Sequence, residues 1–228
     1  DAMAIALLLI DLQRDFCSPG GYAHQAGIDI SRTQAVVANA QRLLQAARAL
    51  GLTVVHTREG HVPSLIDGPP AKLQRSVAAG APIGSLGPMG RLLVRGEHGH
   101  GIVDELEPAP DEPVIDKPGY GAFHQTRLGN VLAARGIERL VLAGVTTEVC
   151  VHSTLREAVD RGYLCTTVSD ATAASQPELQ APALAMIGVE GGIFGRVLDT
   201  DAVLAEWGAP GAPAPDRVAT WMTAWTGA

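Results

Sequence analysis

The sequence predicts an α/β fold. We expect a single-domain, doubly wound sheet that is mostly parallel, with about six strands in a Rossmann-like three-layer sandwich. Apolar runs of strand length alternate with segments of helical periodicity, which is typical of this class. The first run, residues 4–10, is apolar throughout, as in a central parallel strand covered on both faces. No repeat or clear boundary divides the 228 residues, so we expect one domain over residues 1–228, with peripheral tails at 1–3 and 208–228.

The first half of the chain holds the strand at residues 4–10, a Gly-rich loop and a helix. Ser31 and Gln34 have the spacing of a capping box, apolar residues then recur at helical spacing as far as Leu50, and Gly51 ends the helix. Residues 52–56 are the predicted second strand. Residues 58–101 are rich in Gly and Pro and weakly periodic, so they are predicted to form a long functional loop or to hold short elements.

The second half alternates more regularly. Gly136 and Gly162 end two of its predicted helices, and Pro182 starts or kinks another. The predicted strands are residues 113–116, 138–145 and 163–168, and the predicted helices are residues 126–135, 148–161, 177–187 and 200–207.

Composition and charge narrow the class of protein. The net charge is −7 and no basic patch or tail occurs, so nucleic acid is not an expected partner. No apolar run reaches the length of a membrane span, and the N-terminus lacks a signal-peptide pattern. Three cysteines are too few to imply a disulfide framework. We therefore expect a cytoplasmic protein that does not bind membranes.

Cys150 is the strongest candidate for a reactive residue. It follows the predicted strand 138–145 after a short polar turn, where a helix is predicted to begin. The N–H groups and dipole at a helix N-terminus lower a thiol pKa and stabilise an oxyanion. Taken alone, a small buried cysteine packed under a helix is the more common case.

Two charged residues occupy similar positions. Asp11 follows the first strand, and Lys117 follows the strand at 113–116. Taken alone, Asp11 could cap a turn and Lys117 could be a solvated loop residue. The carboxyl ends of parallel strands form the edge of the sheet at which ligands bind in open α/β folds. The sequence thus predicts a thiol, a cation and a carboxylate at one site.

Three motifs in family order resemble the isochorismatase-like cysteine hydrolases. The segments that carry the resemblance are residues 9–16, 116–118 with Phe123, and 144–151 followed by Thr154 and residues 156–158. The resemblance covers about residues 5–205. It implies a catalytic triad of Asp11, Lys117 and Cys150, and a non-proline cis peptide at Val145–Thr146. It further implies that the N–H groups of Thr146 and Cys150 form the oxyanion hole and that Phe16 flanks the substrate.

Within the family, residues 20–22, 56–61 and 190–195 look most similar to biuret hydrolases. The implied function is hydrolysis of a linear amide C–N bond in biuret or a close analogue such as guanylurea, through a covalent acyl-enzyme. Biuret hydrolases are expected to carry glutamine where this chain has Glu190. Since glutamate only accepts hydrogen bonds, Glu190 would favour an amine-rich or cationic substrate, if it does not simply face water.

Other functions stay open at this point. A ureidoacrylate or N-carbamoyl amidohydrolase and a nicotinamidase-like amidase are the alternatives among enzymes. The non-enzyme alternatives are a ligand-binding protein and a redox thiol protein, although no Cys-x-x-Cys motif occurs. His56 and His61 lack the metal-binding pattern of nicotinamidases, so we expect neither metal nor cofactor. Relatives imply a homodimer or homotetramer with a small-molecule amide substrate.

Overall fold

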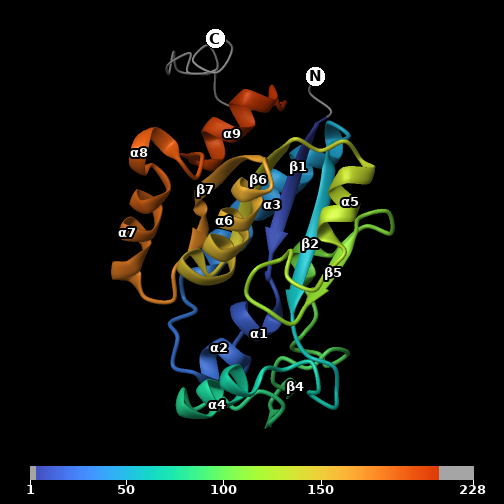
Figure 1. Ribbon diagram of the computed structural model, residues 1–228, viewed down its shortest axis with the longest axis vertical. Coiled ribbons are helices and arrows are strands. Elements are labelled where there is room, and N and C mark those ends of the chain that lie inside the picture. The colour runs from blue at the N-terminus through green and yellow to red at the C-terminus, as the bar shows by residue number, and fades with distance from the viewer. Residues whose placement is uncertain (1–3, 211–228) are drawn as a thin grey trace.

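The centre of the protein is a six-stranded sheet with the order β5-β2-β1-β6-β7-β8 (Figure 1). The computed structural model describes residues 4–210. All neighbouring strands in this sheet are parallel, which confirms the predicted doubly wound α/β fold. The strands are β1 (Ile5–Ile10), β2 (Thr53–Glu59), β5 (Val114–Lys117), β6 (Arg139–Val145), β7 (Leu164–Ala173) and β8 (Arg196–Leu198).

Helices cover both faces of this sheet. On one face, α3 (Thr33–Ala49) and α9 (Thr200–Trp207) bury apolar side chains with those of β1, β6 and β7. On the other face, α5 (Leu128–Ala134), α6 (His152–Asp160) and the end of α7 (Pro177–Ile187) build a second cluster with the opposite sides of the strands. Alternate residues of β1 point into the two clusters, which explains why this strand is apolar throughout. No helix among residues 4–210 is long and apolar enough to cross a membrane.

The start of α3 differs from the sequence prediction. The N-cap is Arg32, whose side chain does not cap the helix, so the expected capping box of Ser31 and Gln34 is wrong. The Ser31 N–H instead donates to the Asp29 side chain, because that Asp lies two residues earlier in a local turn. The end of the helix is as expected, since Gly51 takes a positive φ of 67°.

Residues 58–101 contain a short helix and short strands rather than one long loop. Strand β2 continues to Glu59, beyond its predicted end at His56. The rest of the segment holds α4 (Pro70–Ala78) and the short strands β3 (Leu86–Gly87) and β4 (Gly90–Arg91). Together with α1 (Arg14–Cys17) and α2 (Tyr22–Gln25), these elements lie beyond the carboxyl ends of the central strands (Figure 1). The segment therefore covers the edge of the sheet at which the site was predicted.

The C-terminal part contains two elements that the sequence analysis missed. These are α8 (Val189–Gly192) and β8, a three-residue strand too short to show a period. Strand β7 also extends to Ala173, five residues past its predicted end. Of the tail expected from residue 208, Ala209 is buried and belongs to the core. Residues 1–3 and 211–228 lie outside the described part of the chain.

Gly144 lets β6 approach β1 closely just before the polar turn. Its φ is 129°, and a Cβ atom there would lie 2.0 Å from the Ile10 carbonyl oxygen. Any side chain would push β6 away from β1 at the ends of both strands. Since Asp11 follows Ile10 and Cys150 follows this turn, the contact holds these two residues close together.

Glu112 anchors the entry to β5 and gives a pH-dependent contribution to stability. Burial alone would raise its pKa, but hydrogen bonds from Arg48, His56 and the Ala109 N–H outweigh burial and lower the pKa to about 2. A lowered carboxyl pKa contributes stability above the ordinary value of 4.5, and this contribution is lost as the pH falls towards 2.

We expect Glu112→Gln to lower the free energy of unfolding by roughly 1–2 kcal/mol at pH 7, allowing for solvent screening at this partly exposed site. The difference from the unchanged protein should shrink progressively below about pH 4.5 and vanish near pH 2. Urea unfolding at several pH values measures it. A difference that stays constant from pH 7 to pH 3 would show that the charge of Glu112 is not the cause.

Candidate active site

Asp11 and Lys117 form a fully buried ion pair at the carboxyl ends of β1 and β5. Lys117 Nζ lies 2.8 Å from Asp11 Oδ2. The other carboxylate oxygen of Asp11 accepts a hydrogen bond of 2.6 Å from the Thr57 hydroxyl. Lys117 also donates to the carbonyl oxygens of Gly119 and Tyr120, at 3.0 and 2.8 Å. Partners surround both charges, so the pair has one fixed geometry at this edge of the sheet.

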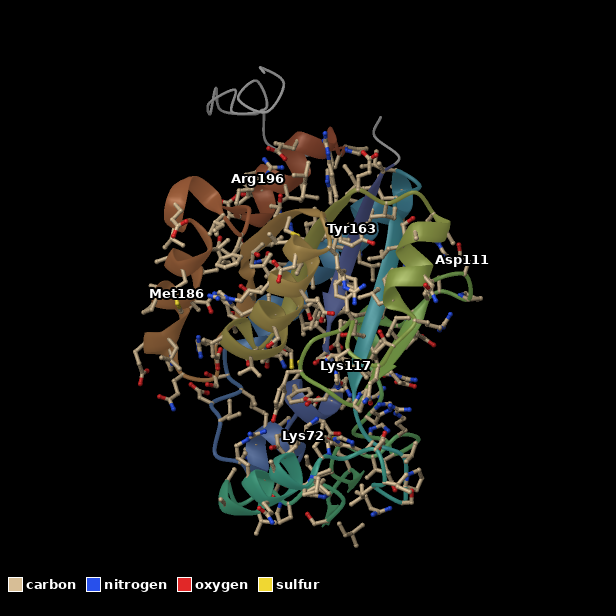
Figure 2. The ribbon with its side chains drawn as sticks, viewed as in Figure 1. Lys72, Asp111, Lys117, Tyr163, Met186 and Arg196 are labelled. Carbon is tan, nitrogen blue, oxygen red and sulfur yellow. The ribbon has the colours of Figure 1, made fainter. Side chains whose placement is uncertain are left out.

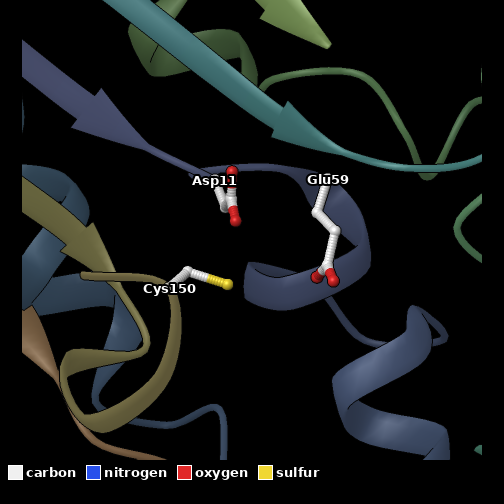
Figure 3. A group of neighbouring side chains, drawn as sticks. All are labelled: Asp11, Glu59 and Cys150. Atoms are coloured by element: carbon white, nitrogen blue, oxygen red, sulfur yellow. The ribbon is translucent and has the colours of Figure 1, made fainter. Parts of the chain in front are cut away.

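The backbone at Asp11 leaves the strand abruptly. Asp11 takes a positive φ of 53°, which is uncommon for residues other than glycine and more frequent for Asp than for most. Its N–H donates to the carbonyl oxygen of Thr57, at 3.2 Å. This turn directs the carboxylate towards Cys150, as Figure 3 shows.

Cys150 lies in a single π-helical turn, Thr147–Val151, that precedes α6. The sequence analysis expected an ordinary α-helix to begin there. Neighbouring side chains fix the turn, because the Thr147 hydroxyl donates to Gln180 of α7 at 2.7 Å and the Glu148 carboxylate accepts from the Ser175 N–H at 2.9 Å. The wider turn is of the kind often found at functional sites.

The structure changes the expected charge state of Cys150. Burial raises the pKa of its thiol well above the ordinary value, and the charges of Asp11 and Glu59 add to this effect. The charge of Lys117 lowers the thiol pKa, as expected, but does not offset burial. The thiol therefore stays protonated at neutral pH and needs a base when it attacks. Asp11 is one of two neighbouring carboxylates, with an oxygen within 4.8 Å of the sulfur.

A cavity of about 380 Å³ opens beside the sulfur. Its wall includes Cys150 and Thr146, the two residues expected to form the oxyanion hole, and Phe16, the residue expected to flank the substrate. The Val145–Thr146 peptide bond is cis, as the family resemblance implied. Phe16 packs edge to face against Tyr22, with ring centroids 6.0 Å apart. The cavity is thus an aromatic-walled pocket with the thiol exposed to a small ligand.

Glu190 does not join this group. It is exposed on α8, after α7 has carried the chain back to the opposite end of the sheet from α1, α2 and α4 (Figure 1). It is absent from the cavity wall, so the expected substrate contact of Glu190 is not met within the described chain.

A second buried ion pair, between Glu59 and Lys72, lies in the cavity wall and was not predicted from the sequence. Lys72 Nζ lies 2.7 Å from Glu59 Oε1 and also donates to the Pro118 carbonyl oxygen at 2.7 Å. Figure 2 shows Lys117 and Lys72 one after the other below the strand ends. Glu59 could have been identified by its position at the end of β2, as Asp11 and Lys117 were. It was overlooked because the strand was predicted to stop at His56.

Asp11, Glu59 and Cys150 also form the group that could hold a metal ion, with one donor atom from each within 4.8 Å of the others. Both carboxylates already have an ammonium partner, Lys117 and Lys72, which a cation would have to displace or face. The two histidines considered from the sequence are not members of this group and have other partners. His56 contacts Glu112 at 2.7 Å and His61 contacts Asp67 at 3.2 Å. The absence of a metal stays a prediction.

The protein thus has an open parallel sheet with a buried Asp–Lys pair and a thiol at its carboxyl edge, the edge at which ligands bind in α/β proteins. The isochorismatase domain family matches residues 5–202, and the chain belongs to this family. The predicted resemblance to isochorismatase-like cysteine hydrolases is thereby confirmed, and with it the expectation of a hydrolase.

Three relatives illustrate the similarity. The ureidoacrylate amidohydrolase RutB of Yersinia enterocolitica is 36% identical over 202 residues, which cover 87% of this chain and 86% of that protein. A cysteine hydrolase from Pseudomonas syringae superposes with a TM-score of 0.77 at 27% identity, covering 91% of this chain and 94% of the other. The N-carbamoylsarcosine amidase of Thermoplasma acidophilum superposes with a TM-score of 0.67 at 25% identity, covering 87% and 98%.

Proposed function

We propose that the protein is a cysteine-dependent amidohydrolase that cleaves a linear C–N bond of a small urea-type amide, such as biuret or guanylurea. The observation that carries the proposal is the buried Asp11–Lys117 pair facing the Cys150 thiol at the wall of a small cavity. The substrates that name two relatives support the class, since ureidoacrylate and N-carbamoylsarcosine both contain an H₂N–CO–N group.

The first half of the reaction forms an acyl-enzyme. As Cys150 Sγ attacks the carbonyl carbon, its proton passes to the Asp11 carboxylate. The N–H groups of Thr146 and Cys150 stabilise the oxyanion. When the carbonyl re-forms, the C–N bond breaks, and Asp11 returns the proton to the departing nitrogen, which leaves as ammonia. Cys150 then carries the rest of the substrate as a thioester-type adduct.

The second half regenerates the thiol. Asp11 accepts a proton from water as the water oxygen attacks the acyl carbon, and the C–S bond breaks. The proton on Asp11 returns to the sulfur, and the product leaves as a carbamic or carboxylic acid. Throughout, Lys117 keeps a positive charge beside Asp11. Burial would lower its own pKa, but the negative charges of Asp11 and Glu59 outweigh burial and raise the pKa, so Lys117 stays protonated.

A second candidate is a ureido acid, such as ureidoacrylate or another N-carbamoyl compound. Arg75 of α4 lines the cavity, stacks on the Tyr120 ring 5.4 Å from its centroid and donates to the Tyr120 hydroxyl. It has no carboxylate partner among residues 4–210, so its charge is open to a substrate carboxylate.

Ammonia release from a panel of compounds tests the proposal. The panel holds biuret, guanylurea, ureidoacrylate, N-carbamoylglycine and nicotinamide, each with the unchanged protein and with a Cys150→Ser control. We expect release from at least one urea-type compound and none with the control. Release from nicotinamide alone, or from no member of the panel, would contradict the proposed substrate class.

A further inference from the structure

Glu59 is a buried carboxylate beside the reacting sulfur that the mechanism above does not use. It is the last residue of β2, its exposed fraction is 3%, and it lines the cavity. One of its carboxylate oxygens lies within 4.8 Å of both Cys150 Sγ and an Asp11 oxygen. Figure 3 shows the three side chains converging from three separate segments on one small space.

The position of Glu59 is fixed from both ends. Gln13 holds its backbone, because the Gln13 side chain accepts from the Glu59 N–H at 2.8 Å and donates to the Glu59 carbonyl at 2.9 Å. Lys72 holds Oε1 of the carboxylate at 2.7 Å. Oε2 accepts no hydrogen bond from the residues that the structure describes. A fixed carboxylate with one free oxygen is thus presented to the cavity.

The three substituents of a substrate carbonyl carbon can be placed around the sulfur. The oxygen faces the N–H groups of Thr146 and Cys150, and the departing nitrogen faces Asp11, which protonates it. The third substituent then faces Glu59, the remaining member of the group of Asp11, Glu59 and Cys150. In a simple carboxamide this substituent is a carbon, which has no hydrogen-bond donor for a carboxylate. In a ureido compound it is an N–H, which donates to a carboxylate.

We propose that Glu59 accepts a hydrogen bond from the nitrogen that the substrate retains, and thereby selects ureido compounds over simple carboxamides. The inference rests on the proposed function and makes its substrate class narrower. Glu59 is in this view a specificity residue, because it binds the part of the substrate that is not cleaved. Lys72 pairs with the other carboxylate oxygen, Oε1, and takes no part in this hydrogen bond.

Two pairs of compounds isolate the retained N–H. Malonamide is biuret with CH₂ in place of the central NH, and succinamate is N-carbamoylglycine with the same replacement. The measured quantity is the ratio of kcat/KM for the NH compound to that for its CH₂ partner. Differences in intrinsic carbonyl reactivity cancel when this ratio is compared between the unchanged protein and a variant.

Glu59→Gln is the decisive variant. The glutamine oxygen would take the place of Oε1 beside the Lys72 ammonium, which leaves the amide NH₂ pointing into the cavity. A donor would then face the substrate N–H. We expect the NH/CH₂ ratio to fall about ten- to a hundred-fold, the loss that accompanies removal of a hydrogen bond to a charged group.

Two further variants separate this role from a structural one. Lys72→Met breaks the same ion pair but keeps the Glu59 carboxylate, so we expect it to keep the NH/CH₂ ratio within about three-fold even if total activity falls. Glu206→Gln removes a carboxylate from the Arg196–Glu206 ion pair between β8 and α9 and should change neither ratio nor activity.

The outcomes separate the inference from the proposed function. A ratio that falls in Glu59→Gln and holds in Lys72→Met supports it. Equal falls in both variants, or an unchanged ratio in Glu59→Gln, would show that Glu59 has only a structural role, in the ion pair with Lys72 that joins β2 to α4. If the unchanged protein hydrolyses none of the four compounds and neither guanylurea nor ureidoacrylate, the proposed function fails and the assignment of Glu59 fails with it.

Discussion

Cys150→Ser should lose amide hydrolysis by at least about 10³-fold while the protein stays folded. The thiol is buried at the cavity wall, and its pKa is already raised by burial and by Asp11. A serine hydroxyl in the same place is far harder for the Asp11 carboxylate to deprotonate. A hydroxyl is smaller than a thiol and fits the same space, so the turn Thr147–Val151 should keep its shape.

Cys165→Ser is the matched control. Cys165 is also buried and free, but it lies in β7, and its sulfur contacts the Tyr163 carbonyl oxygen at 3.6 Å, which a hydroxyl can use as an acceptor. Its activity should match that of the unchanged protein. A folded Cys150→Ser protein with near-normal turnover would remove Cys150 as the nucleophile.

Lys117→Met should lower kcat/KM by about 10²- to 10⁴-fold at neutral pH. Burial raises the pKa of Asp11, and the charge of Lys117 is the main effect that opposes burial. Without that charge the Asp11 pKa rises further, so a smaller fraction of Asp11 is ionised at pH 7 and able to accept the thiol proton. The acidic limb of the pH–rate profile should therefore move to higher pH.

Iodoacetamide labelling of Cys150 gives an independent measurement. In Lys117→Met the thiol pKa should rise, because the positive charge that favours the thiolate is gone, and labelling near neutral pH should slow. Arg127→Met, which removes a cation outside the cavity wall, serves as the control. Identical pH profiles for labelling and turnover in Lys117→Met and the unchanged protein would show that Lys117 acts on neither Asp11 nor Cys150.

Much of the site could be predicted from where strands end. Asp11 follows an apolar run with no alternation, and Cys150 follows another strand and a polar turn, so their shared edge follows from parallel topology alone. Lys117 was found in the same way, although it is the last residue of β5 rather than the residue after the strand. These predictions needed only strand periodicity and the rule that parallel strands share a carboxyl edge.

The rest of the site depends on tertiary contacts that have no local signature. Glu59 extends β2 only because β5 continues to pair with it, in the register Glu59–Lys117. Lys72 lies in α4, a helix inside a segment too rich in Gly and Pro to show a period. The raised thiol pKa is a consequence of burial, which the position of Cys150 before a helix did not reveal.

Glu190 is the reverse case, a residue that was predicted to contact the substrate but lies away from the cavity. Its motif placed it among candidate substrate contacts, but its side chain is exposed and it lies after α7, at the far end of the sheet from the cavity. Sequence similarity to a family position does not fix where a loop residue lies when the helix before it sets the direction of the chain. The cavity instead receives its free carboxylate oxygen from Glu59.

Rapid-quench mass spectrometry of the protein during turnover of biuret tests the central claim most directly. We expect the peptide containing Cys150 to gain transiently the mass of the acyl group, H₂N–CO–NH–CO in place of the thiol hydrogen. The adduct should be absent in Cys150→Ser. Steady turnover of biuret with no adduct on Cys150 at any quench time, or with an adduct on Cys17 or Cys165 instead, would contradict covalent catalysis by this residue.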